Sequence, residues 1–165
     1  MLNRTWIALV LRLILATGGI YATAALPAQY GPLDSYSAYY EMMLGNFSIL
    51  FSILAIGLMI HADPKWQFTA GMLVILACFD KFEQPVMHYT AAALFFIGAT
   101  TAMWNDERVE YFGKLSLMFY PTIFLDMLIF EAIQIWFICT YHLIYVIKIM
   151  KIKWQRDKIK FKFGD

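Results

Sequence analysis

The polar side chains best placed for chemistry lie in the last apolar stretch of the chain. Five of them share one face of a predicted helix, because positions 131 and 142 are about three turns apart: Glu131, Gln134, His142, Tyr145 and Lys148. A polar stripe on a membrane helix has to face protein or water, since lipid offers no hydrogen-bond partners. The stripe could line a pathway for protons or solutes, or it could form a hydrogen-bond ladder between helices. We favour the ladder.

Acidic residues and one histidine form a second pattern, at the turns between apolar stretches. Under the six-span topology derived below, all of them fall on the outer side of the membrane: Asp34, Glu41, Asp80, Glu83, His88, Asp126 and Glu131. Carboxylates near apolar surroundings shift towards their neutral form and can bind protons or cations. Most of these residues could equally mark exposed loop ends, whereas Asp126 and Glu131 interrupt apolar sequence. The candidate polar or ion site comprises Asp80, Glu83, His88, Asp126, Glu131 and His142.

The three histidines, His61, His88 and His142, invite a metal or haem hypothesis. They fall at different predicted depths, and the sequence contains no HxxxH or HExxH pair. His88 and His142 form the one pair that could ligate a haem from facing helices, but we expect no haem, metal or other cofactor. The sequence also lacks GxSxG, P-loop and dinucleotide-binding glycine patterns. We therefore predict no catalytic residue and favour a protein that is not an enzyme.

The composition predicts which elements position these residues. Hydrophobic residues make up 61% of the 165 positions and charged residues 15%, against roughly 45–50% and 25% in soluble domains. These values exclude a disordered chain and an ordinary soluble domain, and they predict an all-α, multi-pass membrane bundle. We expect one transmembrane domain over residues 1–150 and a basic cytoplasmic tail over 151–165.

Six membrane spans fit the apolar stretches better than five. The predicted spans cover residues 6–26, 43–60, 66–79, 85–104, 108–129 and 131–150. Pro27 is expected to end the first span, and Arg12 within it favours an uncleaved helix over a signal peptide. The last two spans should reverse between Asp126 and Glu131, because one helix over 115–147 would be about 50 Å long in a hydrocarbon core of about 30 Å. With six spans, both termini and most of the basic residues lie in the cytoplasm.

Small residues at helical spacing predict where the helices pack closely. They are Gly18 and Ala22 in the first span, Gly45, Ser48, Ser52 and Ala55 in the second, and Gly98 and Ala102 in the fourth. The fourth span is the richest in small residues, so we expect it at the centre of the bundle.

The basic tail bears on the choice of partners. Seven of the 13 Lys and Arg residues lie between positions 148 and 162. Basic residues that follow a membrane helix are typical of a cytoplasmic end in contact with anionic lipids, and nucleic acid is not an expected partner. Small-residue seams without catalytic motifs favour a non-catalytic subunit or accessory component of a membrane assembly. The alternatives are a small transporter or a lipid- or solute-binding protein with an acidic, aromatic-rich outer mouth, and thirdly a membrane enzyme.

Overall fold

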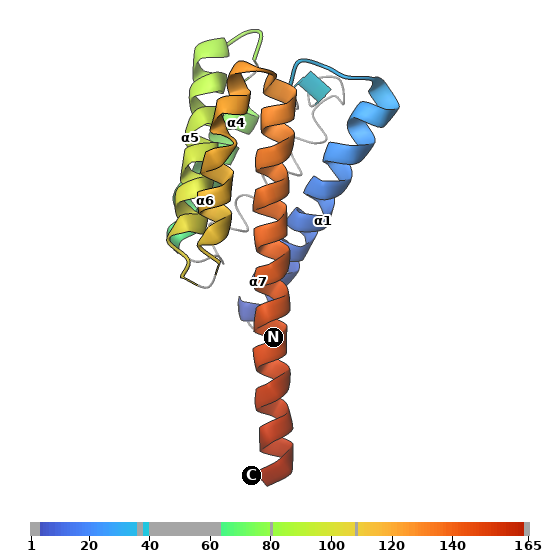
Figure 1. Ribbon diagram of the computed structural model, residues 1–165, viewed down its shortest axis with the longest axis vertical. Coiled ribbons are helices and arrows are strands. Elements are labelled where there is room, and N and C mark those ends of the chain that lie inside the picture. Colours follow the sequence, from blue (N-terminus) through green and yellow to red (C-terminus); the bar gives the residue numbers. More distant parts are fainter. Residues whose placement is uncertain (1–3, 36–37, 40–63, 80, 108, 164–165) are drawn as a thin grey trace.

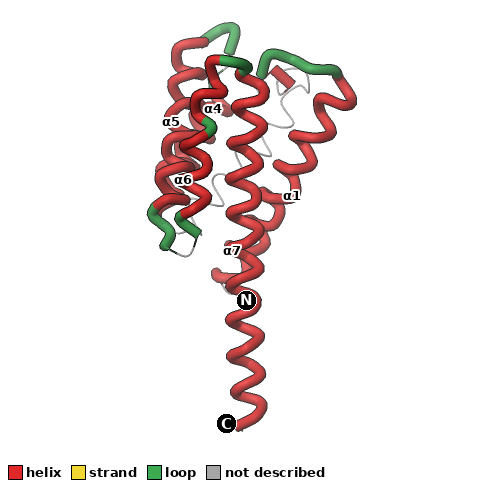
Figure 2. The backbone as a smooth tube through the Cα atoms, in the orientation of Figure 1, coloured by secondary structure: helices red, strands yellow, loops and turns green. Residues whose placement is uncertain are grey.

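The computed structural model describes residues 4–35, 38–39, 64–79, 81–107 and 109–163. Within these ranges the regular secondary structure is all helical, with loops and turns between the helices and no strand, which confirms the all-α prediction (Figure 2). Among the described residues, three helices are long and apolar enough to cross a membrane, over Trp6–Tyr30, Pro85–Trp104 and Met127–Gln155. The predicted second span, 43–60, lies outside the described residues.

The described helices form two groups on either side of one long helix (Figure 1). Helix α7 (Met127–Phe163) packs along α1 (Arg4–Tyr30) on one side. On its other side lie α4 (Gln67–Cys78), α5 (Pro85–Trp104) and α6 (Tyr111–Met118). Helix α7 contacts α1 on one side and α5 and α6 on the other. Among the described helices it therefore has the central place that the sequence analysis expected for α5.

The first helix ends later than predicted. Pro27 lies inside the last turn of α1, which continues to Tyr30. Gly31 then adopts a positive φ of 79°, and its N–H donates to the Pro27 carbonyl at 3.0 Å. Glycine takes this left-handed conformation without a steric penalty, so it ends a helix more effectively than a proline in the last turn.

The predicted fourth span agrees with α5 at both ends, from Pro85 to Trp104. Pro85 begins the helix, where the missing N–H costs no intrahelical hydrogen bond. The predicted third span corresponds to the short 3₁₀ helix η1 (Pro64–Trp66) followed by α4. Helix α4 packs against α5.

The chain reverses before α7, not within it, so the predicted turn between Asp126 and Glu131 is wrong. Helix α6 is followed by the 3₁₀ helix η2 (Tyr120–Phe124), and α7 already begins at Met127. Pro121 is at the start of η2, and the Asp126 carboxylate accepts the backbone N–H of Ile129 at 3.1 Å. Asp126 is thus the N-cap of α7, and an N-cap residue precedes its helix. The predicted single span over 108–129 is replaced by α6 and η2.

Helix α7 has 37 residues and continues through position 150 into the basic tail. Both ends of the described chain lie towards the same end of the bundle, beyond which the C-terminal part of α7 projects (Figure 1). The main apolar core joins α5, α6 and α7 around Phe96, Met103, Phe112, Phe130 and Ile138.

Candidate functional site

A buried arginine and a buried histidine connect the first and last described helices. Arg12 of α1 is 2% exposed and His142 of α7 is fully buried. A guanidinium nitrogen of Arg12 lies 3.1 Å from Nδ1 of His142, and the guanidinium carbon lies 4.1 Å from the centroid of the Tyr145 ring. Arginine can only donate, so Nδ1 accepts and the neutral ring carries its proton on Nε2. That Nε2 is buried and has no hydrogen-bond partner among the residues that the structure describes.

The same network extends to the turn after α5. Tyr141 Oη donates to a carboxylate oxygen of Asp106 at 2.8 Å and accepts from Trp66 Nε1 at 3.4 Å. The Trp66 and His142 ring centroids are 4.4 Å apart. We call Arg12, Trp66, Asp106, Tyr141 and His142 the inner polar cluster. The cluster buries one cation, Arg12, and one anion, Asp106. His142, Trp66 and Tyr141 lie between them, and their hydrogen bonds and ring contacts lower the free-energy cost of removing both charges from water.

A second network lies about two turns nearer the start of α7, at Gln134. Ser116 Oγ donates to Gln134 Oε1 at 2.5 Å, and Gln134 Nε2 donates to the Ser116 carbonyl at 3.0 Å. Thr100 Oγ1 lies 2.9 Å from Ser116 Oγ and 3.0 Å from Tyr120 Oη. A continuous chain of hydrogen bonds therefore leads from Tyr120 through Thr100 and Ser116 to Gln134. It connects η2, α5, α6 and α7.

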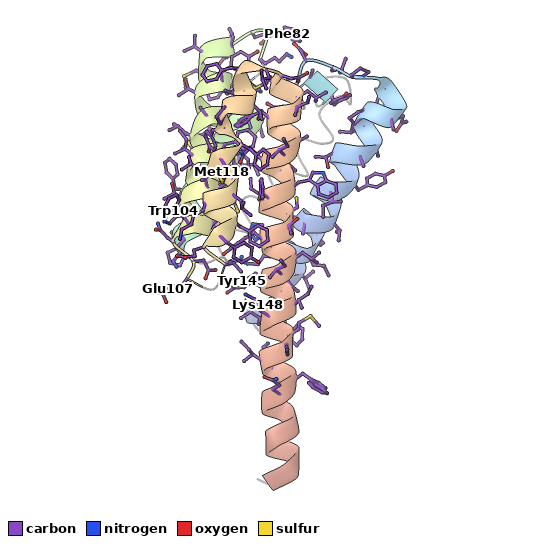
Figure 3. All side chains as sticks on the ribbon, in the orientation of Figure 1. Phe82, Trp104, Glu107, Met118, Tyr145 and Lys148 are labelled. Carbon is purple, nitrogen blue, oxygen red and sulfur yellow. The ribbon has the colours of Figure 1, made fainter. Side chains whose placement is uncertain are left out.

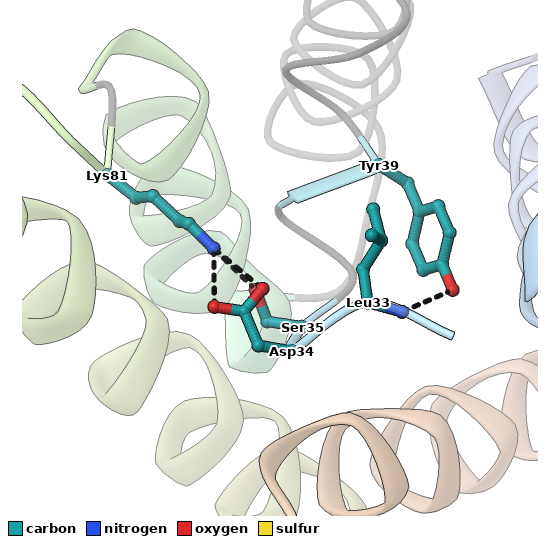
Figure 4. Close-up of polar contacts among 5 residues, drawn as sticks. All are labelled: Leu33, Asp34, Ser35, Tyr39 and Lys81. Atoms are coloured by element: carbon teal, nitrogen blue, oxygen red, sulfur yellow. Dashed lines mark hydrogen bonds and ion pairs between the residues drawn. The ribbon is translucent and has the colours of Figure 1, made fainter. Parts of the chain in front are cut away.

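The opposite end of the bundle carries an ion pair (Figure 4). The ammonium of Lys81 is buried and lies 3.1 and 3.3 Å from the two carboxylate oxygens of Asp34, which is exposed. Ser35 Oγ is 3.4 Å from the same ammonium. The hydrogen bond from Lys81 lowers the pKa of Asp34 below its ordinary value of 3.8. This pair joins the segment after α1 to the α4–α5 turn.

The residues of the predicted polar or ion site are divided between the two ends. The turn before α5 and the first turns of α5 and α7 lie at the Lys81 end (Figure 1). In sequence these segments carry Glu83, His88, Asp126 and Glu131, while His142 is about 16 Å further along α7 than Glu131. His88 Nδ1 lies 2.7 Å from the Phe79 carbonyl oxygen, and Glu131 is buried. Asp80 is outside the described residues. The structure therefore does not bring the five described residues of this set into one site.

The described residues do not form a preformed site for a metal ion or a haem. No group of three His, Cys, Asp or Glu side chains is clustered among them for a metal ion. Nδ1 of His88 and Nδ1 of His142 each bond to a different neighbour. His61 lies outside the described residues.

The predicted packing positions differ in how closely their neighbours approach. At Gly98 an added Cβ would lie 2.8 Å from Thr69 Oγ1 and 2.9 Å from a Phe68 ring carbon. At Gly18 it would meet nothing within 4 Å, whereas the adjacent Gly19 contacts Cys139 Sγ and Ile135. The close contact of α1 is therefore one residue later than predicted.

The other predicted packing residues fall into two groups. Ala22 and Ala102 are buried, in agreement with a packing role. Gly45, Ser48, Ser52 and Ala55 lie outside the described residues. The sequence analysis also missed Gly113, whose Cα faces the backbone of Trp104 at the α5–α6 turn.

Sequence reasoning missed most of the inner polar cluster. It singled out His142 but not Arg12, Trp66, Asp106 or Tyr141. The usable signal was Arg12 itself, because an ionisable residue within an apolar span needs a polar partner.

Comparisons of the chain with protein-family models, curated proteins and solved structures find no match.

Proposed function

We propose that the protein is a non-catalytic integral membrane component that packs with other membrane subunits or with itself. The observation that carries the proposal is how the polar groups of the apolar helices are used. Arg12 bonds to His142 and Gln134 bonds to Ser116, so each pair joins two helices. Polar side chains used in this way stabilise a helix bundle and do not leave reactive groups open to a substrate.

The outward faces of α1 and α7 support contact with lipid or with another membrane helix. Large apolar side chains are exposed on both: Val10, Leu13, Ile14 and Tyr21 on α1, and Ile129, Trp136 and Ile147 on α7. Exposed apolar surface of this extent is costly in water and suits an apolar surrounding.

A six-span topology with both termini in the cytoplasm completes this proposal. Its support is the alternating direction of the described helices, the position of both described ends, and the basic residues gathered beyond them (Figure 1). Lys148, Lys151 and Lys153 would lie at the inner surface, where anionic lipids attract basic side chains. Lys153 also lies over the Trp6 ring, with the ammonium 4.2 Å from its centroid, and so ties the start of the tail to α1.

Purification under mild conditions tests the proposal. The C-terminally tagged protein should retain a partner at constant stoichiometry, or form a defined oligomer, through exchange between two mild detergents. Changing Val10, Leu13 and Ile14 together to Ala should reduce that retention. The same change at Val86 and Met87, which are exposed at the start of α5, is the control. A monomer without partners in both detergents would contradict the proposal.

A small transporter is the second candidate, and it draws on the arrangement at the Lys81 end. Asp34, Lys81, His88 and Glu131 lie at that end, and Glu131 is buried in an apolar helix. A buried carboxylate of this kind is a candidate proton or cation carrier. The protein reconstituted alone in liposomes should then show proton or cation flux, and Glu131→Gln should abolish the flux while the protein still folds.

A further inference from the structure

A groove opens on the outer surface of α5, where α6 and η2 lie against it. One stripe of α5 forms its first wall, because Ile97, Thr100, Thr101 and Trp104 are three or four residues apart. Leu117 and Tyr120 form the opposite wall, and Asn105 closes one end. The cavity volume is about 360 Å³, within the range of about 300–1,000 Å³ that is usual for small-molecule sites.

The hydroxyl groups on the two walls of the groove have little hydrogen-bonding capacity to spare. The hydroxyls of Thr100 and Tyr120 are 3.0 Å apart, and Thr100 also bonds to Ser116. Thr101 Oγ1 donates to the Ile97 carbonyl at 2.8 Å. Since these hydroxyls already have partners, this part of the groove offers a ligand mainly van der Waals contact.

One end of the groove is different, because it carries hydrogen-bond donors. The indole N–H of Trp104 and the side-chain amide of Asn105 form no hydrogen bond within the described part of the chain. The Lys114 ammonium lies 6.0 Å from the centroid of the Trp104 ring, and it is shared with Glu110 in an exposed pair at 2.8 Å. The other end is apolar, with Ile97 and Leu117 about half exposed. Trp104, at the end with the donors, is labelled in Figure 3.

We propose that this groove binds one membrane phospholipid. Its acyl chain would lie along Ile97 and Leu117, and its phosphate would meet Trp104, Asn105 and Lys114. The groove lies on α5, one of the three helices able to span a membrane, so its length runs along the direction of a lipid tail. Tryptophan and lysine are the side chains typical of the level of the headgroups. The inference rests on the membrane location of the bundle and is independent of any protein partner.

Photocrosslinking of the unmodified protein tests the position of the lipid. The probe is phosphatidylglycerol with a diazirine in one acyl chain, incorporated into vesicles that contain the purified protein. Crosslinks should concentrate in peptides that contain residues 97–104 and 115–120. An even distribution over the exposed faces of α1, α5 and α7 would show only bulk lipid and would overturn the proposal.

A pair of matched variants tests the site by filling it. Thr101→Trp places a bulky side chain in the groove, and Thr90→Trp places the same side chain on an exposed position of α5 outside it. Native mass spectrometry after detergent exchange should show at least a fivefold loss of bound phosphatidylglycerol for Thr101→Trp and no loss for Thr90→Trp. Equal retention by both variants would overturn the proposal, as would equal loss.

Two further measurements complete the test. If Thr101→Trp lowers the melting temperature by more than Thr90→Trp does, the smaller Thr101→Leu replaces it, and it should also reduce the bound phosphatidylglycerol. Diacylglycerol, which has the same tails but no phosphate, should compete at least fivefold less well than phosphatidylglycerol. Equal competition would overturn the assigned phosphate contact. Loss of a co-purifying protein from Thr101→Trp with unchanged lipid retention would assign the groove to a protein partner and overturn the lipid.

Discussion

Arg12 and His142 are 130 positions apart in the sequence and 3.1 Å apart in the structure. The contact joins the first and last described helices, and both side chains are buried. A buried guanidinium needs an acceptor, and the neutral histidine supplies one. The pair is therefore a specific tie between α1 and α7, in addition to the apolar contacts along their length.

Removing either member of this pair should destabilise the bundle. Arg12→Leu loses a hydrogen bond to a charged group, at a cost of about 1.5–3 kcal/mol. His142→Leu should cost more, because it leaves the Arg12 cation buried without that acceptor. Unfolding in mixed micelles should give these two values and that of the double variant. If the single losses simply add, the two side chains are not coupled.

Two adjacent glycines in α1 provide a test of helix packing. Gly19→Leu should destabilise the protein by about 1–3 kcal/mol, as core overpacking does, because Gly19 contacts Cys139 and Ile135. Gly18→Leu should be tolerated, since an added Cβ there meets nothing within 4 Å in the described part of the chain. Thermal unfolding of both variants in one detergent measures the difference. The same melting temperature for both would place the α1–α7 contact elsewhere.

Gly98 and Gly71 allow the same comparison between α4 and α5. Gly98→Leu should lower stability by about 1–3 kcal/mol, because an added Cβ would lie 2.8 Å from Thr69 Oγ1. Gly71→Leu on α4 serves as the control, because an added Cβ at Gly71 meets nothing within 4 Å among the described residues. A melting temperature for Gly98→Leu equal to that of the wild type would show that α4 can move away without cost.

The cap of α7 can be tested at Asp126. Asp126→Ala removes the acceptor for the Ile129 N–H and should cost about 0.5–2 kcal/mol, whereas Asp126→Asn should retain most of the stability. Chemical unfolding of the three proteins gives the comparison. Equal losses for Ala and Asn would indicate that the charge matters and the cap does not.

The Asp34–Lys81 pair predicts a pH dependence in acid. The pKa of Asp34 is lowered in the folded protein, so the unfolded chain binds the proton more tightly. The pair then contributes stability above the ordinary pKa of 3.8, and the contribution is lost as the pH falls through the lower folded value. Asp34→Asn should flatten the stability profile between about pH 5 and pH 2. An unchanged acid slope in this variant would show that other carboxylates cause it.

The elements that could be predicted from the sequence are those with strong local signals. Pro85 and the apolar run to Trp104 define α5 at both ends, because a proline at the first helical position and a run of 20 residues are both unambiguous. The start of α7 was missed, although Pro121 and Asp126 are ordinary helix-boundary residues. We placed the start of the last helix too late because we divided residues 108–150 into two spans, each long enough to cross the membrane.

The candidate site was less predictable because it depends on distant contacts. The polar stripe of α7 was recognised, and the burial of Glu131, Gln134 and His142 agrees with a ladder. Its partners, Ser116 and Arg12, come from other helices, so no spacing within α7 could identify them. The shift from Gly18 to Gly19 is a rotation of α1 by one residue, about 100°, which only the packing of α1 against α7 determines.

The unbroken course of α7 has a mechanical consequence. The helix contains neither proline nor glycine over its 37 residues and is about 55 Å long, so it has no residue at which it would bend sharply. Its tail and the segment that holds His142 therefore tilt together as one rod. Over the last 15 residues, about 22 Å, a tilt of about 10° moves the tip by about 4 Å. A force applied to the basic tail would reach the Arg12–His142 contact directly.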